Sequence, residues 1–107
     1  MDTLKTLEQV VLSRKDKKEE GSYTCYLFEK GIDKILKKVG EEASETIIAA
    51  KNADNNELKG EVADLLYHIM VMCVDRGLSW KEVEDVLNER HNKTGNLKTF
   101  HVVDKNT

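Results

Sequence analysis

The chain has 107 residues, no proline and a net charge of −3, from 17 Lys and Arg against 20 Asp and Glu. This length fits one domain with a single core, and the slightly acidic balance excludes a general nucleic-acid or membrane-surface binder. Charged residues make up 35% and aromatic residues 6%, which favours long helices over a sheet of short strands. We therefore predict an all-α fold, a helical bundle of four to five helices per chain that is completed by dimerisation.

The first half of the chain predicts two helices separated by a charged segment. Apolar side chains at helical spacing indicate a short helix over residues 3–15. The run RKDKKEEGSYTC, residues 14–25, mixes charges of both signs and is typical of a solvated loop. A long helix is expected over 33–53, because Asp33 follows a glycine break as a capping residue and the turn 52–56 is rich in Asn and Asp.

The second half predicts two more helices and a tail. A helix over 57–76 ends at a glycine placed as the residue after a helix C-terminus usually is. A capping-box pair opens a fourth helix at Ser79, and its apolar pattern fades by His91. Residues 1–92 are therefore assigned to one domain, and residues 93–107 to a loosely attached tail.

The helical positions of the acidic residues separate those beside the core from those that face water. On the helix over 33–53, Glu42 borders the apolar stripe and Glu45 lies next to Glu42. That stripe consists of Ile32, Leu36, Val39, Ala43, Ile47 and Ala50. The helix over 57–76 is apolar nearly all round, which predicts burial on several sides. Its one narrow polar strip is made of Glu61, Asp64, His68 and Asp75.

These two helices predict a cluster of four carboxylates. If they form an antiparallel hairpin, the pair Glu42 and Glu45 faces the pair Glu61 and Asp64. Four carboxylates at the margin of a core repel one another unless they are protonated or bound to a cation. Mg²⁺ prefers oxygen ligands and commonly binds carboxylates together with waters and phosphates. The sequence therefore predicts a Mg²⁺ site for phosphate chemistry, although the same spacing also arises by chance in an acidic chain.

Four segments, in this order and spacing, resemble the phosphoribosyl-ATP pyrophosphatases of histidine biosynthesis. They are GSYT at 21–24, KKVGEEASE at 37–45, EVADLLYH at 61–68 and RH at 90–91, and the similarity spans roughly residues 4–91. The resemblance implies an all-α, MazG-like nucleoside triphosphate pyrophosphatase that forms dimers. It also implies that the protein hydrolyses phosphoribosyl-ATP to phosphoribosyl-AMP and pyrophosphate and uses Mg²⁺.

The resemblance further implies roles for single residues. The family's metal ligands, which also carry the catalysis, fall on Glu42, Glu45, Glu61 and Asp64. The expected substrate-binding residues are Ser22, Tyr23, Thr24, Lys38, Glu41 and His68. For two of these an ordinary role stays open: Lys38 meets phosphate or balances its neighbouring glutamates, and His68 steadies Asp64 or is a satisfied core histidine.

Two other functions remain open. A housecleaning pyrophosphatase for noncanonical nucleoside triphosphates shares the same carboxylates, whereas a non-catalytic helical oligomerisation module carries them as surface charge. The expected partners are phosphoribosyl-ATP and a second copy of the chain, with pairing of dimers into tetramers left open and with no nucleic acid or membrane. A cytoplasmic location is expected, because there is no secretory signal and no apolar run near the ~18 residues that span a bilayer.

Overall fold

The computed structural model describes residues 2–94, which form five α-helices and no strand and so confirm the predicted all-α class. The helices are α1 (Thr3–Asp16), α2 (Tyr23–Lys30), α3 (Ile32–Lys51), α4 (Asn55–Asp75) and α5 (Trp80–Thr94). Within this part of the chain, no helix has the length and apolarity needed to cross a bilayer. The predicted tail, residues 93–107, lies outside the described residues except for its first two, which end α5.

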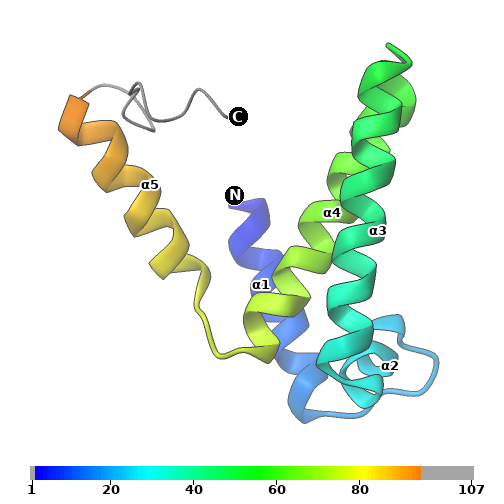
Figure 1. Ribbon diagram of the computed structural model, residues 1–107. Coiled ribbons are helices and arrows are strands. Elements are labelled where there is room, and N and C mark those ends of the chain that lie inside the picture. The colour runs from blue at the N-terminus through cyan, green and yellow to red at the C-terminus, as the bar shows by residue number, and fades with distance from the viewer. Residues whose placement is uncertain (1, 95–107) are drawn as a thin grey trace.

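The fold is built on an antiparallel hairpin of α3 and α4, which make the most extensive contact between any two helices. The two helices are joined by residues 52–54, and α1 and α2 pack against the half of the hairpin that is remote from this turn (Figure 1). The core lies there, where four helices contribute fully buried side chains. These side chains are Val11, Leu27, Ile35, Met70 and Val71. Each such side chain stabilises the fold by roughly 1.5–3 kcal/mol relative to its exposed state.

The C-terminus of α4 is closed by backbone and side-chain contacts. Gly77 has φ +76°, and its N–H donates to the Val74 carbonyl at 3.1 Å. The next residue, Leu78, donates to the Cys73 carbonyl at 2.9 Å, which completes a Schellman motif and confirms the predicted glycine stop. Lys15 of α1 adds a hydrogen bond from Nζ to the Val74 carbonyl at 3.2 Å. A cation at this position also complements the negative end of the α4 dipole.

The helix α5 is attached through its first residues. Ser79 and Glu82 form the predicted capping box, in which the Glu82 carboxylate accepts from the Ser79 N–H at 3.0 Å. The Trp80 N–H donates to Glu8 of α1 at 2.8 Å, and the contact of α5 with α1 is the most extensive one that α5 makes in the described part of the chain. From this attachment α5 extends away from the hairpin on the other side of α1 (Figure 1).

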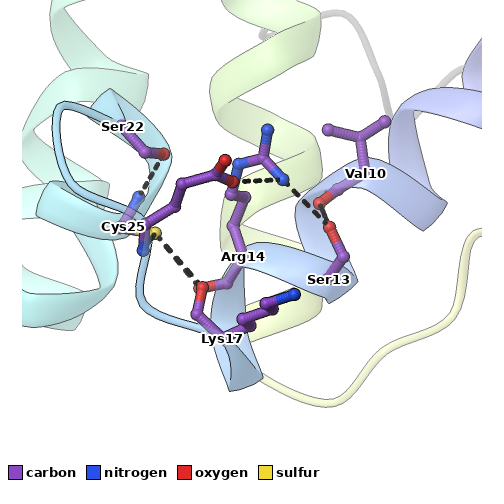
Figure 2. Close-up of polar contacts among 7 residues, drawn as sticks. Val10, Ser13, Arg14, Lys17, Ser22 and Cys25 are labelled. Atoms are coloured by element: carbon purple, nitrogen blue, oxygen red, sulfur yellow. Dashed lines mark hydrogen bonds and ion pairs between the residues drawn. The ribbon is translucent and has the colours of Figure 1, made fainter.

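The helix α2 lies where the sequence predicts the end of a loop and a break. The predicted loop over 14–25 is wrong at both ends, since α1 continues to Asp16 and α2 begins at Tyr23. Ser22 caps α2 by accepting the Cys25 N–H at 3.1 Å, and the Cys25 thiol donates to the Arg14 carbonyl at 3.5 Å (Figure 2). Leu27 is fully buried. A helix of eight residues has too few turns to show an apolar period, so tertiary packing rather than pattern defines it.

The helix α3 begins at Ile32, with Gly31 as its capping residue at φ +94°. The prediction of Asp33 as the cap is therefore wrong. Asp33 instead lies in the first turn, where a carboxylate is favoured by the positive end of the helix dipole.

The buried face of α3 is rotated by one residue from the predicted stripe. The buried residues are Ile35, Glu42 and Ala49, each one position before a residue that the sequence pattern selects. Ile47, a member of the predicted stripe, is 69% exposed. The prediction that α4 is buried on several sides is also wrong in its first half, because Val62 is exposed. The end of the hairpin near its turn extends beyond the other helices (Figure 1).

Candidate metal centre and active site

Three of the four predicted carboxylates meet where α3 and α4 face each other. Glu42 and Glu45 of α3 and Glu61 of α4 each offer an oxygen, and these oxygens all lie within 4.8 Å of one another. We call Glu42, Glu45 and Glu61 the carboxylate trio. Glu42 is only 7% exposed, Glu61 is half-buried and Glu45 is exposed, so the trio is closed on one side and open to solvent on the other.

Two buried oxygens of the trio lack a hydrogen-bond partner among the described residues, namely Oε2 of Glu42 and Oε1 of Glu61. An unpaired buried acceptor costs about 1–3 kcal/mol, and more when it is charged. Burial, and then the nearby carboxylates of Glu45 and Glu42, raises the pKa of Glu61 to about 7. A hard cation bound to these oxygens gives the unpaired acceptors a partner and offsets the repulsion between the carboxylates. The trio therefore fits a divalent ion such as Mg²⁺.

Asp64, the fourth predicted ligand, does not join the trio. Its side chain is exposed. It follows Glu61 by three residues, which turns its side chain about 60° around α4 from the direction of Glu61. Its backbone carbonyl accepts a hydrogen bond from His68 Nδ1 at 2.8 Å. His68 therefore contacts the Asp64 backbone and not its carboxylate, and a role for Asp64 as a ligand stays a prediction.

Lys38 lies beside the trio on α3. Its Nζ is 3.3 Å from a Glu41 carboxylate oxygen and 3.7 Å from a Glu42 carboxylate oxygen. Burial acts to lower the pKa of Lys38, but the hydrogen bond to Glu41 and the charges of Tyr23, Glu41 and Glu42 raise it overall. Lys38 is thus a cation held at the rim of the site, where it partly offsets the buried charge of Glu42.

Thr46 connects the two helices that carry the trio, a role that the sequence pattern does not indicate. Its hydroxyl lies 2.7 Å from the Glu42 carbonyl oxygen and 3.3 Å from the Glu61 carbonyl oxygen. The first contact is the usual hydrogen bond from a helical Thr to the carbonyl four residues earlier. The second crosses to α4, and it could not be foreseen without the hairpin register.

The three hydroxyl groups of the GSYT segment all have partners within the protein. Ser22 caps α2, the Tyr23 hydroxyl lies 3.1 Å from His68 Nε2, and the Thr24 hydroxyl is hydrogen-bonded to the Tyr67 hydroxyl. His68 is 5% exposed with both ring nitrogens satisfied, which favours the core-histidine alternative. Of these expected substrate-binding residues, Tyr23 is the most exposed, at 45%.

The chain is similar to known proteins over the region that holds these site residues. The family model described as "Phosphoribosyl-ATP pyrophosphohydrolase" matches residues 4–91. The chain is 58% identical to the phosphoribosyl-ATP pyrophosphatase of Streptococcus sanguinis over 94 aligned residues, and this alignment covers 88% of this chain and 90% of that protein. It is 54% identical to the protein of that name from Streptococcus gordonii, over 95% of this chain and 98% of that one. It is also 58% identical to the histidine biosynthesis bifunctional protein HisIE of Bacillus subtilis, over 81% of this chain and 42% of that larger protein.

Proposed function

The chain belongs to the phosphoribosyl-ATP pyrophosphohydrolase family, and on this premise we propose that it hydrolyses phosphoribosyl-ATP to phosphoribosyl-AMP and pyrophosphate with Mg²⁺ held by the carboxylate trio. It is a hydrolase of histidine biosynthesis, in keeping with the names of its relatives. One observation carries the metal part of the proposal. It is the pair of buried, unpartnered carboxylate oxygens that α3 and α4 contribute to one spot.

The trio supplies the proposed ligands, with Asp64 expected as a fourth from its exposed position one turn along α4. When bound, Mg²⁺ neutralises charge on the triphosphate and on the pyrophosphate leaving group and lowers the pKa of water. Glu61 must release its proton before it can hold a cation, and its pKa of about 7 allows this near neutral pH. The open side of the trio, at Glu45, is where the phosphates enter.

Lys38 and Glu41 are proposed to act on the substrate from the rim. In the absence of substrate, Lys38 is paired with Glu41 and lies near Glu42. A phosphate group that enters beside the trio offers Lys38 a stronger acceptor than a half-exposed carboxylate, because its oxygens carry more charge. Lys38 then transfers part of its pairing from Glu41 to the phosphate, which favours binding of the highly charged substrate.

We also propose that the protein functions as a homodimer. Apolar side chains are exposed on the projecting end of the hairpin and on α5. They include Ile47, Ile48, Val62, Val86 and Leu87. A second copy of the chain is the proposed cover for these side chains, and pairing of dimers into a tetramer is the further assembly to be tested. A cytoplasmic location belongs to the same proposal, because a nucleotide with this many charges does not cross a bilayer unaided.

The deciding experiment offers phosphoribosyl-ATP, dUTP and dCTP separately to the purified protein, with Mg²⁺ or with EDTA, and measures pyrophosphate. We expect release from phosphoribosyl-ATP alone, and only with Mg²⁺. Preference for dUTP or dCTP would instead support a housecleaning pyrophosphatase. A protein that releases no pyrophosphate from any of the three would be the non-catalytic helical module. Asp85→Asn, which alters an exposed α5 carboxylate paired with Lys81, serves as the inert control.

A further inference from the structure

The first turn of α2 is tied to α4 by two neighbouring residue pairs. The hydroxyl of Thr24 bonds the hydroxyl of Tyr67, and the hydroxyl of Tyr23 bonds Nε2 of His68 at 3.1 Å. The partners are consecutive on both helices, so the two bonds together define the orientation of α2 relative to α4. They are the side-chain hydrogen bonds that join these two helices within residues 2–94.

The proton positions in this arrangement follow from the acceptors. His68 Nδ1 lies 2.8 Å from the Asp64 carbonyl oxygen, which can only accept, so Nδ1 carries a hydrogen. In a neutral imidazole Nε2 is then an acceptor, and the Tyr23 hydroxyl donates to it. The Tyr23 oxygen is left with acceptor capacity alone. It can therefore accept from a donor on a ligand or from an ammonium group, but it has no hydrogen to offer a phosphate.

Tyr23 is open to solvent, with 45% of its surface exposed. Its hydroxyl bonds His68, whose other ring nitrogen bonds the backbone carbonyl of Asp64, the proposed fourth ligand. Burial raises the pKa of Tyr23, the charge of Lys38 lowers it and that of Glu42 raises it. The Tyr23 ring is stacked with those of Tyr26 and Tyr67, at 6.0 Å and 6.2 Å between ring centroids. An exposed aromatic side chain beside a charged site is a typical substrate contact.

We propose that Tyr67 is a positioning residue for the hydrolysis of phosphoribosyl-ATP, acting through Thr24 to hold Tyr23 in its place against His68. The inference rests on the proposed function. The helix α2 is kept folded by other groups, since Leu27 is fully buried and Ser22 caps the first turn. Removing the Tyr67 hydroxyl therefore lets the first turn of α2 shift without unfolding the helix.

Tyr67→Phe tests this inference through the separate values of KM and kcat for phosphoribosyl-ATP at saturating Mg²⁺. Loss of one neutral hydrogen bond in a positioning role predicts a rise in KM of about 3- to 10-fold, with kcat changed by less than about 2-fold. Tyr26→Phe is the matched control, because the Tyr26 hydroxyl makes no hydrogen bond in the part of the chain that the structure describes. It should leave both constants at their wild-type values.

Thr24 provides the second variant and the rescue. Thr24→Val should raise KM as Tyr67→Phe does, the double variant should be no worse than either single variant, and Thr24→Ser should restore the wild-type KM. The rise in Tm that Mg²⁺ causes in the substrate-free protein should be the same in all of them. A wild-type KM in both single variants, or a fall in kcat that follows a fall in Tm, overturns the inference alone. Absence of hydrolysis by the wild-type protein overturns the proposed function, and this inference with it.

Discussion

Glu42 of α3 and Glu61 of α4 bring carboxylate oxygens within 4.8 Å of each other, and each buries one oxygen that has no partner among the described residues. Two negative groups so close together in a partly dry site repel strongly. Lys38 offsets this repulsion only in part, and a shared proton or a bound cation relieves it further. The same pair therefore predicts how stability depends on pH and how it depends on Mg²⁺.

The pH dependence of stability follows from Glu61. Its pKa is about 7 in the folded protein against 4.5 for an unperturbed glutamate, so the folded state holds a proton that the unfolded state releases. Its contribution to the free energy of unfolding is fully present below pH ~4.5 and is lost as the pH rises through ~7. In metal-free protein, the Tm of the wild type should fall relative to that of Glu61→Gln over this interval. Parallel Tm curves for the two proteins would contradict the prediction.

The response to Mg²⁺ should separate the trio from other acidic residues. Mg²⁺ should raise the Tm of the wild type, more at pH 8 than at pH 6, because cation binding must displace the Glu61 proton. Glu42→Gln should abolish this rise and lower kcat/KM by about 100-fold or more, since a ligand and not only an orienting group is lost. Asp85→Asn should retain both the rise and the activity. Equal Mg²⁺ responses in the two variants would rule out the trio as the site.

Asp64 should behave differently from Glu61. Its carboxylate is exposed, so Asp64→Asn should change the free energy of unfolding without Mg²⁺ by no more than about 0.5 kcal/mol, and the Tm should stay close to that of the wild type. If Asp64 joins the ligands when Mg²⁺ and substrate bind, the variant should need a higher Mg²⁺ concentration for half-maximal activity, by about 10-fold. An unchanged Mg²⁺ titration would remove Asp64 from the ligand set. Tm and activity measured on the same preparation separate the two outcomes.

The sequence predicts the hairpin and a cluster of four carboxylates, of which three converge, because these features depend on spacing along two long helices. It selects the wrong face of α3, however, since a stripe through Leu36 and Ile47 is more apolar than the buried face through Ile35 and Glu42. A hydrophobic pattern marks side chains that favour burial, but it does not show what covers them. On the projecting end of the hairpin, no other described helix of the same chain covers these side chains (Figure 1).

The contacts of α2 could not be predicted for a different reason. The bonds from Thr24 to Tyr67 and from Tyr23 to His68 join residues more than 40 positions apart. Their prediction requires the orientation of α2 relative to α4 as well as the hairpin. A sequence pattern shows which residues share a helix face, but not which polar groups meet across two helices.

Thr46→Val should loosen the link between the helices that carry the trio. The substitution keeps the shape of the side chain but removes the hydroxyl that bonds the Glu42 carbonyl and approaches the Glu61 carbonyl. We expect a loss of about 0.5–1.5 kcal/mol in the free energy of unfolding and a weaker Mg²⁺ response. Thr46→Ser should recover both. If urea unfolding and the Mg²⁺-induced Tm rise match the wild type in Thr46→Val, the contact with α4 has no energetic importance.

Ile47→Glu should separate the proposed dimer into monomers. Ile47 is 69% exposed in the single chain, so a charge there costs a monomer little, generally within about 0.5 kcal/mol. In a dimer that covers this side chain, the same charge loses its water without gaining a partner and weakens association by at least about 10-fold. Light scattering during size-exclusion chromatography should show a dimer for the wild type and a monomer for the variant at the same concentration. Leu12→Glu adds the same charge at an exposed apolar position on α1 and should remain dimeric, because α1 lies away from the projecting end of the hairpin. A monomeric wild type, or a dimer that Ile47→Glu leaves intact, would mean that this surface is not the interface.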